Sequence, residues 1–128
     1  MKRFLIMSLL TFSLFGAANA SEVPFSGKQQ KSEYEVTLVK DTRNAEGVRH
    51  ITVEPAGVCS YQIDIDAKDG VILKVVFGGG CSGNTQGVAK LVQGMKVTEA
   101  IEKLEGIRCG NRPTSCPDQL ARALKLLL

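Results

Sequence analysis

The hydrophobic period of this chain changes once, after Gly80, and this change constrains the fold more than any other feature. Before it, apolar and polar residues alternate, which is typical of strands with one buried face. After it, apolar residues recur at intervals of three and four, which is typical of helices. Strands followed by helices predict an α+β domain in which the helices cover one face of an antiparallel sheet.

The segments predicted as strands share the alternating pattern and span residues 33–40, 48–54, 58–66 and 71–78. The residues expected on their buried faces are Val36, Leu38, Ile51, Val53, Tyr61, Ile63, Ile65, Leu73, Val75 and Phe77. Asp69-Gly70 joins the last two segments, and this dipeptide is strongly favoured in tight hairpins. We therefore expect an antiparallel sheet of about four strands.

Three helices are predicted in the remainder of the chain. The first can be capped by Asn84 or Thr85, the second by Thr98, and Gly106 provides a left-handed stop for the second. The residues expected to face the sheet are Val88, Leu91, Val92, Met95, Ile101, Leu104, Leu120, Ala123, Leu124 and Leu127.

The start of the third helix carries the clearest capping signal. Ser115 is the expected N-cap, and Asp118 follows three residues later in a capping-box relation. Pro117 falls in the first turn, where its missing N–H costs nothing. These residues predict a helix that begins at or next to Cys116.

The N-terminus has the pattern of a secretory signal peptide over residues 1–20. Lys2 and Arg3 precede an apolar run over residues 4–15, and small residues lead to expected cleavage after Ala20. The run is shorter than the roughly 20 apolar residues that cross a bilayer, so no stable membrane anchor is expected after cleavage. Export to the periplasm or the medium is predicted, followed by a polar linker over residues 21–32 and a single domain over residues 33–128.

Charge argues against some classes of partner. The net charge of +3 falls by two when the leader, with its two basic residues, is removed. A mature chain so close to neutral gives no indication of nucleic acid or an anionic membrane as partner. His50 is the only histidine and has no neighbouring partner in sequence, so a surface or packing role is expected for it.

The candidate site is the set of four cysteines, Cys59, Cys81, Cys109 and Cys116. Two of them precede or begin predicted helices, where backbone amides favour a thiolate. Four thiolates suit a tetrahedral zinc ion or an iron–sulfur cluster, although only the last two cysteines are close in sequence. Two disulfides are the alternative, since exported proteins meet an oxidising compartment, and four cysteines allow three pairings. The residues alone leave a metal site, two disulfides and free thiols all open.

Five short motifs follow one another in the C-terminal part of the chain. They are G-V-C-S at 57–60, G-G-G-C-S-G-N at 78–84, L-V-Q-G-M at 91–95, G-I-R-C-G at 106–110 and T-S-C-P-D-Q-L at 114–120. In this order they resemble the TSCPD domain family, over about residues 56–128. TSCPD domains occur as a C-terminal module of some ribonucleotide reductases and as small free-standing proteins. The resemblance implies a metal site and an accessory or regulatory link to deoxyribonucleotide synthesis, with a reductase or another protein as partner.

A chain of 128 residues is too short to reduce a ribonucleotide unaided, because that reaction needs a radical source and a large barrel. Nucleotide reduction is also cytosolic, whereas the N-terminus predicts export, so a cytoplasmic location is the alternative. The alternative function is an exported disulfide-bonded or thiol-redox protein without metal. In that case Cys116 would attack and Cys109 would resolve.

A weaker similarity concerns architecture. The order of Cys59, an Asp-Gly hairpin, Cys81 and a helix ending near Gly94 is similar to iron–sulfur scaffold proteins of the NifU N-terminal type. This similarity implies Cys59 and Cys81 as the first two cluster ligands, with either Cys109 or Cys116 as the third. The aspartate that such scaffolds place after their first cysteine is absent here.

Overall fold

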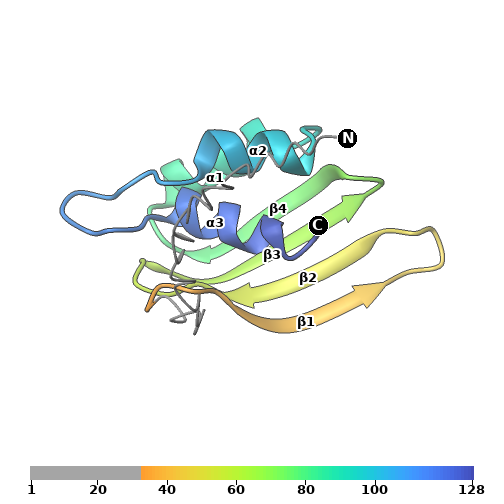
Figure 1. Cartoon of the computed structure of the whole chain (residues 1–128), viewed down its shortest axis with the longest axis horizontal. Helices are drawn as coiled ribbons and strands as arrows, with labels where there is room; N and C mark the ends of the chain where they lie inside the picture. Colours follow the sequence, from red (N-terminus) through yellow and green to blue (C-terminus); the bar gives the residue numbers. More distant parts are fainter. Residues whose placement is uncertain (1–32) are drawn as a thin grey trace, which may run out of the picture.

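The computed structural model describes residues 33–128, and these residues form an antiparallel sheet of four strands (Figure 1). The strands are β1 (Thr37–Arg43), β2 (Arg49–Glu54), β3 (Ser60–Lys68) and β4 (Val71–Gly79). Each strand pairs with the next along the chain, in the order β1-β2-β3-β4. The signal peptide and linker predicted over residues 1–32 lie outside the described residues.

Three helices follow the strands and lie on one face of the sheet (Figure 1). They are α1 (Ser82–Val92), α2 (Val97–Leu104) and α3 (Cys116–Lys125). The predicted α+β arrangement is therefore confirmed. Within residues 33–128, none of the helices has the length and apolar character needed to span a membrane.

The core lies between the sheet and the helices. Ile51 and Val53 of β2 and Ile63 of β3 are completely buried, and so are Leu120 and Leu124 of α3. Each such side chain contributes about 1.5 to 3 kcal/mol to stability through burial. Strand alternation places the polar residues between them on the opposite face of the sheet.

Bulges decide which residues of the strands face this core. The pairing of β3 with β4 shifts its register at Tyr61 in β3 and at Leu73 in β4. Each extra residue reverses the alternation, so Ser60 and Ile72 turn inward, while Tyr61 is 69% exposed. The prediction that Tyr61 and Leu73 face the core was wrong for this reason. Leu38, which is also exposed, borders a similar shift in β1.

The helix starts agree with the sequence only for α3. Helix α1 begins after Cys81 and α2 after Lys96, and neither N-cap makes a side-chain capping bond, so the expected caps are not used. The backbone of Gly106 has φ near 80°, as predicted for the stop after α2. Leu91 is exposed and Val92 is buried, because α1 packs mainly against the edge strand β4 and buries a narrow stripe.

Candidate functional site

All four cysteines line one cavity of about 360 Å³ at the end of the sheet where the α2–α3 loop lies (Figure 1). Cys59 directly precedes β3, and Cys81 connects β4 to α1. Cys109 lies in the α2–α3 loop, and Cys116 is the first residue of α3. The fold thus gathers four thiols that the sequence places on four different elements or loops.

The thiols line the walls of the cavity and are not bonded to one another. All four cysteines are free; Cys116 is buried, and the other three are exposed. Among residues 33–128, no group of three or more His, Cys, Asp or Glu side chains is already arranged to hold a metal ion.

Cys116 is held in place from two sides. Its Sγ atom lies 3.1 Å from Ser60 Oγ, a contact that depends on the inward turn of Ser60 at the β3 bulge. Gly80 closes the other side, with φ at +84°. A Cβ atom at Gly80 would lie 2.6 Å from Ser60 Oγ and 2.9 Å from Thr85 Cγ2. Only glycine therefore fits where the chain passes Cys116.

Positively charged groups surround the cavity. Arg112 Nη1 donates a hydrogen bond to Cys59 Sγ at 3.4 Å. This hydrogen bond, together with the charge interaction with Cys59, raises the pKa of Arg112 above its ordinary value. Arg108 lines the same cavity, and the N-termini of α1 and α3 start at Cys81 and Cys116. Guanidinium groups and free helix amides both stabilise thiolates.

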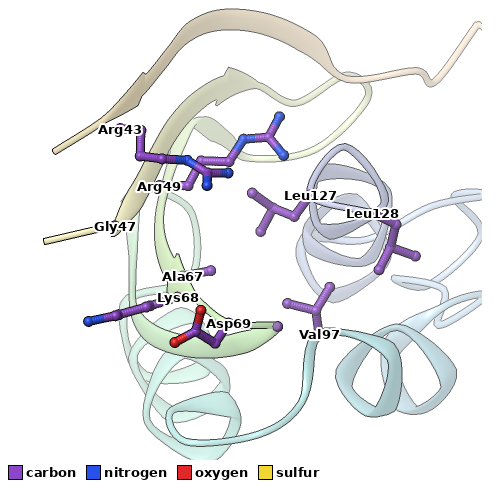
Figure 2. Close-up of a pocket in the computed structure, with 10 residues that line it drawn as sticks. Arg43, Gly47, Arg49, Ala67, Lys68, Asp69, Val97, Leu127 and Leu128 are labelled. Carbon is purple, nitrogen blue, oxygen red and sulfur yellow. The ribbon is translucent and has the colours of Figure 1, made fainter. Parts of the chain in front are cut away.

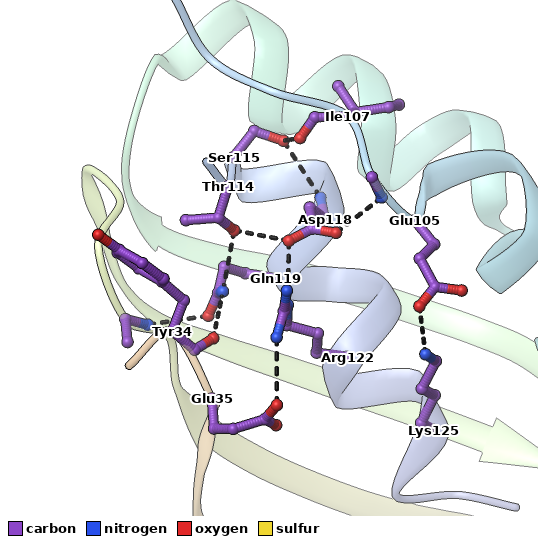
Figure 3. Close-up of polar contacts among 12 residues, drawn as sticks. Tyr34, Glu35, Glu105, Ile107, Thr114, Ser115, Asp118, Gln119, Arg122 and Lys125 are labelled. Carbon is purple, nitrogen blue, oxygen red and sulfur yellow. Dashed lines mark hydrogen bonds and ion pairs between the residues drawn. The ribbon is translucent and has the colours of Figure 1, made fainter. Parts of the chain in front are cut away.

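Polar residues of the T-S-C-P-D-Q motif form hydrogen bonds that connect α3 to other segments of the domain. Gln119 is completely buried, and its side-chain amide makes three hydrogen bonds (Figure 3). Its Oε1 atom accepts from Ala56 N–H at 2.8 Å, and its Nε2 atom donates to the Tyr34 carbonyl at 2.7 Å and to Thr114 Oγ1 at 3.0 Å. Gln119 therefore ties α3 to the segment before β1 and to the β2–β3 loop.

Asp118 ties the same helix to the end of α2 (Figure 3). Its carboxylate accepts hydrogen bonds from Gly106 N–H at 2.8 Å, Thr114 Oγ1 at 2.7 Å and Arg122 Nε at 3.0 Å. Burial raises the pKa of Asp118, but these hydrogen bonds outweigh it, and the pKa lies below its ordinary value. The carboxylate makes these contacts in place of the reciprocal bond to the N-cap that a capping box predicts.

Ser115 is the N-cap of α3, as predicted. Its Oγ atom accepts from Asp118 N–H at 3.2 Å and donates to the Ile107 carbonyl at 2.6 Å. We expect Ser115→Ala to lower the free energy of unfolding by about 1 to 2 kcal/mol, measured by urea denaturation. Ser82→Ala is the matched control, because Ser82 is exposed and contacts only the exposed Gln86 through its side chain. Equal stability of the two variants would contradict the capping role.

A second, smaller pocket lies at the opposite end of the sheet and contains no cysteine (Figure 2). Its volume is about 210 Å³, and Arg43, Arg49 and Lys68 line it beside Val97 and the C-terminal leucines. The hydrogen bond from Arg49 to Asp41, at 2.7 Å from Nη2 to Oδ2, lowers the pKa of that carboxyl. None of the site residues predicted from the sequence lies here.

The geometry defines a class: a small α+β domain with a four-stranded antiparallel meander, three helices on one face and a cysteine-lined cavity at one end. The TSCPD domain family model matches residues 31–128, and the chain belongs to the TSCPD domain family. The match includes the strands that precede the five sequence motifs. Comparisons with curated proteins and with solved structures gave no significant match.

Sequence reasoning identified the four cysteines and missed the side chains around them. Arg108 and Arg112 flank Cys109 closely in sequence, and this concentration of positive charge was a usable signal. Ser60 carried no such sequence signal, because its inward direction depends on a bulge that alternation does not predict. Gln119 was also missed, since its partners lie far away in the sequence.

Proposed function

We propose that this protein is a TSCPD module that binds one thiophilic metal centre, a zinc ion or an iron–sulfur cluster, through Cys59, Cys81, Cys109 and Cys116. The observation that carries the proposal is that all four thiols line one cavity. Residues from separate parts of the chain meet there, and the missing side chain of Gly80 lets the backbone pass close beside Cys116.

The charges of the cavity support this donor set. Four thiolates on a divalent ion leave an excess of two negative charges, which need compensation in a half-buried site. Arg108, Arg112 and the N-termini of α1 and α3 provide positive potential at the cavity. Cys116 is fixed by Ser60, whereas the three exposed cysteines have room to turn toward a shared ion. Metal binding would therefore draw the walls of the cavity together and stabilise the fold.

The biological role that we propose is an accessory or regulatory one in deoxyribonucleotide synthesis. Membership of the TSCPD family supports it, because such domains accompany ribonucleotide reductases. The partner would be a reductase or another protein. Export after cleavage at Ala20 is proposed on residues 1–20 alone, with a cytoplasmic location as the alternative.

The thiol-redox alternative has less support. It requires Cys116 as the attacking thiolate and Cys109 as its resolving partner. Cys116 is, however, the one buried cysteine of the four. An attacking thiol needs access to its substrate, so this arrangement favours a ligand role for Cys116.

Zinc titration of the reduced, metal-free protein tests the proposed function. We expect about one tightly bound Zn²⁺ per chain, together with loss of thiol reactivity at all four cysteines. Cys116→Ser should weaken zinc binding at least tenfold, because a neutral hydroxyl replaces a thiolate ligand. Ser82→Ala, next to Cys81 but without a thiol, should bind as the wild type does. Two disulfides in protein isolated without reductant, or four thiols that stay reactive in excess zinc, would contradict the proposal.

A further inference from the structure

The only histidine of the chain lies in a polar cluster on the face of the sheet opposite the helices. His50 and Thr52 point outward from β2, and Asp64 and Asp66 do so from the adjacent β3. The side chains of His50, Asp64 and Asp66 are 35%, 25% and 33% exposed. The cluster is separate from the cysteine cavity and uses nitrogen and oxygen atoms only.

Asp66 fixes the orientation of the imidazole. Its Oδ1 atom lies 2.6 Å from His50 Nδ1. A carboxylate at this distance accepts a hydrogen bond from Nδ1–H, so the neutral ring carries its proton on Nδ1 and its free lone pair on Nε2. The same carboxylate–histidine contact orients histidine ligands in many metal sites.

The free Nε2 atom of His50 faces two further electron-pair donors. It lies 3.3 Å from Thr52 Oγ1 and 3.8 Å from Asp64 Oδ1. Thr52 Oγ1 donates its own proton to Asp64 Oδ1 at 2.7 Å. In the neutral ring with its proton on Nδ1, Nε2 and the two oxygens can therefore all offer lone pairs to one position. In the protonated ring, Nε2–H donates to Thr52 Oγ1, and a cation must displace that proton.

The three donors are close enough together to bind one metal ion. Their mutual distances of 2.7, 3.3 and 3.8 Å leave a point about 2 Å from all three in the plane of the donors, so tetrahedral coordination of zinc requires small movements of these side chains. Gln62 Nε2 donates to the second oxygen of Asp64 at 2.7 Å and so holds that carboxylate in position.

We propose that His50 Nε2, Asp64 Oδ1 and Thr52 Oγ1 form an open site for a first-row divalent cation such as Zn²⁺. Asp66 is the positioning residue, and water completes the coordination. The site has one imidazole, one carboxylate and one hydroxyl, so only two of its three ligands are acidic, cysteine or histidine side chains. Its affinity for Zn²⁺ is weaker than that of a four-thiolate site, and its ion exchanges readily with solvent.

Nitrogen NMR of the full chain during a Zn²⁺ titration tests this site. Because the sequence contains a single histidine, its imidazole signals need no assignment. We expect the Nε2 resonance to shift with Zn²⁺ while Nδ1 keeps its proton. Asp64→Asn should weaken the response at least tenfold, and Asp66→Asn by about 10- to 100-fold. Asp69→Asn is the matched control, since Asp69 lies in the exposed β3–β4 turn and asparagine accepts its positive φ.

If the His50 nitrogen resonances shifted with pH but not with excess Zn²⁺, the proposal would be overturned, because Nε2 would then bind a proton and no metal ion. Equal responses of Asp64→Asn and Asp69→Asn would overturn it as well. The wild-type titration decides the question even where a variant folds poorly. Thiol reactivity, measured on the same samples, reports on the cysteines, so failure of this site is distinguishable from failure of the proposed function.

Discussion

Replacing Asp118 by alanine is expected to lower the free energy of unfolding by about 3 to 5 kcal/mol. Asp118 is 2% exposed, and its carboxylate receives hydrogen bonds from Gly106 N–H, Thr114 Oγ1 and Arg122. The variant leaves these donors without their partner in a buried position. Urea denaturation at neutral pH measures the effect.

Two comparisons test this explanation. Glu99→Ala removes an exposed carboxylate that pairs with Lys103 at 3.7 Å, and its expected cost is below about 1 kcal/mol. Because the pKa of Asp118 is lowered in the folded protein, its charge stabilises the fold above the unfolded pKa of about 4. This contribution is lost as pH falls through the lower pKa of the folded protein. The free energy of unfolding should therefore fall less with acid in Asp118→Ala than in the wild type. The same pH dependence of stability in both proteins would contradict the stabilising role of the Asp118 charge.

Replacing Gly80 by alanine is expected to lower the free energy of unfolding by about 2 to 4 kcal/mol. The residue has φ at +84°, and the added Cβ would lie 2.6 Å from Ser60 Oγ and 2.9 Å from Thr85 Cγ2. The new methyl group would also lie 3.6 Å from Cys116 Sγ. Relief of the clash must move Ser60 or β4, so we expect weaker zinc binding at the proposed cysteine site as well as lower stability.

Gly83→Ala is the matched control for this prediction. Gly83 lies in the first turn of α1, and an added Cβ there would meet nothing within 4 Å. Alanine is the better helix former, so this variant should be as stable as the wild type or up to about 1 kcal/mol more stable. If Gly80→Ala matched Gly83→Ala in stability, the tight passage beside Cys116 would not be a constraint.

The motif that gives the family its name combines two physical roles. Thr114 and Asp118 of this motif, with the adjacent Gln119, are almost completely buried. Their hydrogen bonds reach the segment before β1, the β2–β3 loop and the turn that follows α2. Cys116 lines the cavity instead. The rigid network therefore positions a single thiol at the start of α3. Variants of the network residues should affect zinc binding at the proposed cysteine site through the position of Cys116.

Much of the architecture could be predicted from residues close together in the sequence. The alternation of Ile63 and Ile65 with polar residues indicates a strand, whichever strand pairs with it. Ser115 caps α3 through a hydrogen bond to a residue in the same turn. Bulges were not predictable in this way. The outward position of Tyr61 depends on the register that β3 adopts against β4, which local pattern does not define.

The order of strands and helices, the start of α3 and the identity of the candidate thiols follow from local sequence, because periodicity and capping act over a few residues. The packing of distant segments places the four cysteines around one cavity and brings His50 of β2 against Asp66 of β3. It also brings Gln119 within hydrogen-bond distance of Tyr34 and Ala56. These contacts join residues far apart in the chain, and only the packing of the helices on the sheet, with its bulged register, brings them together.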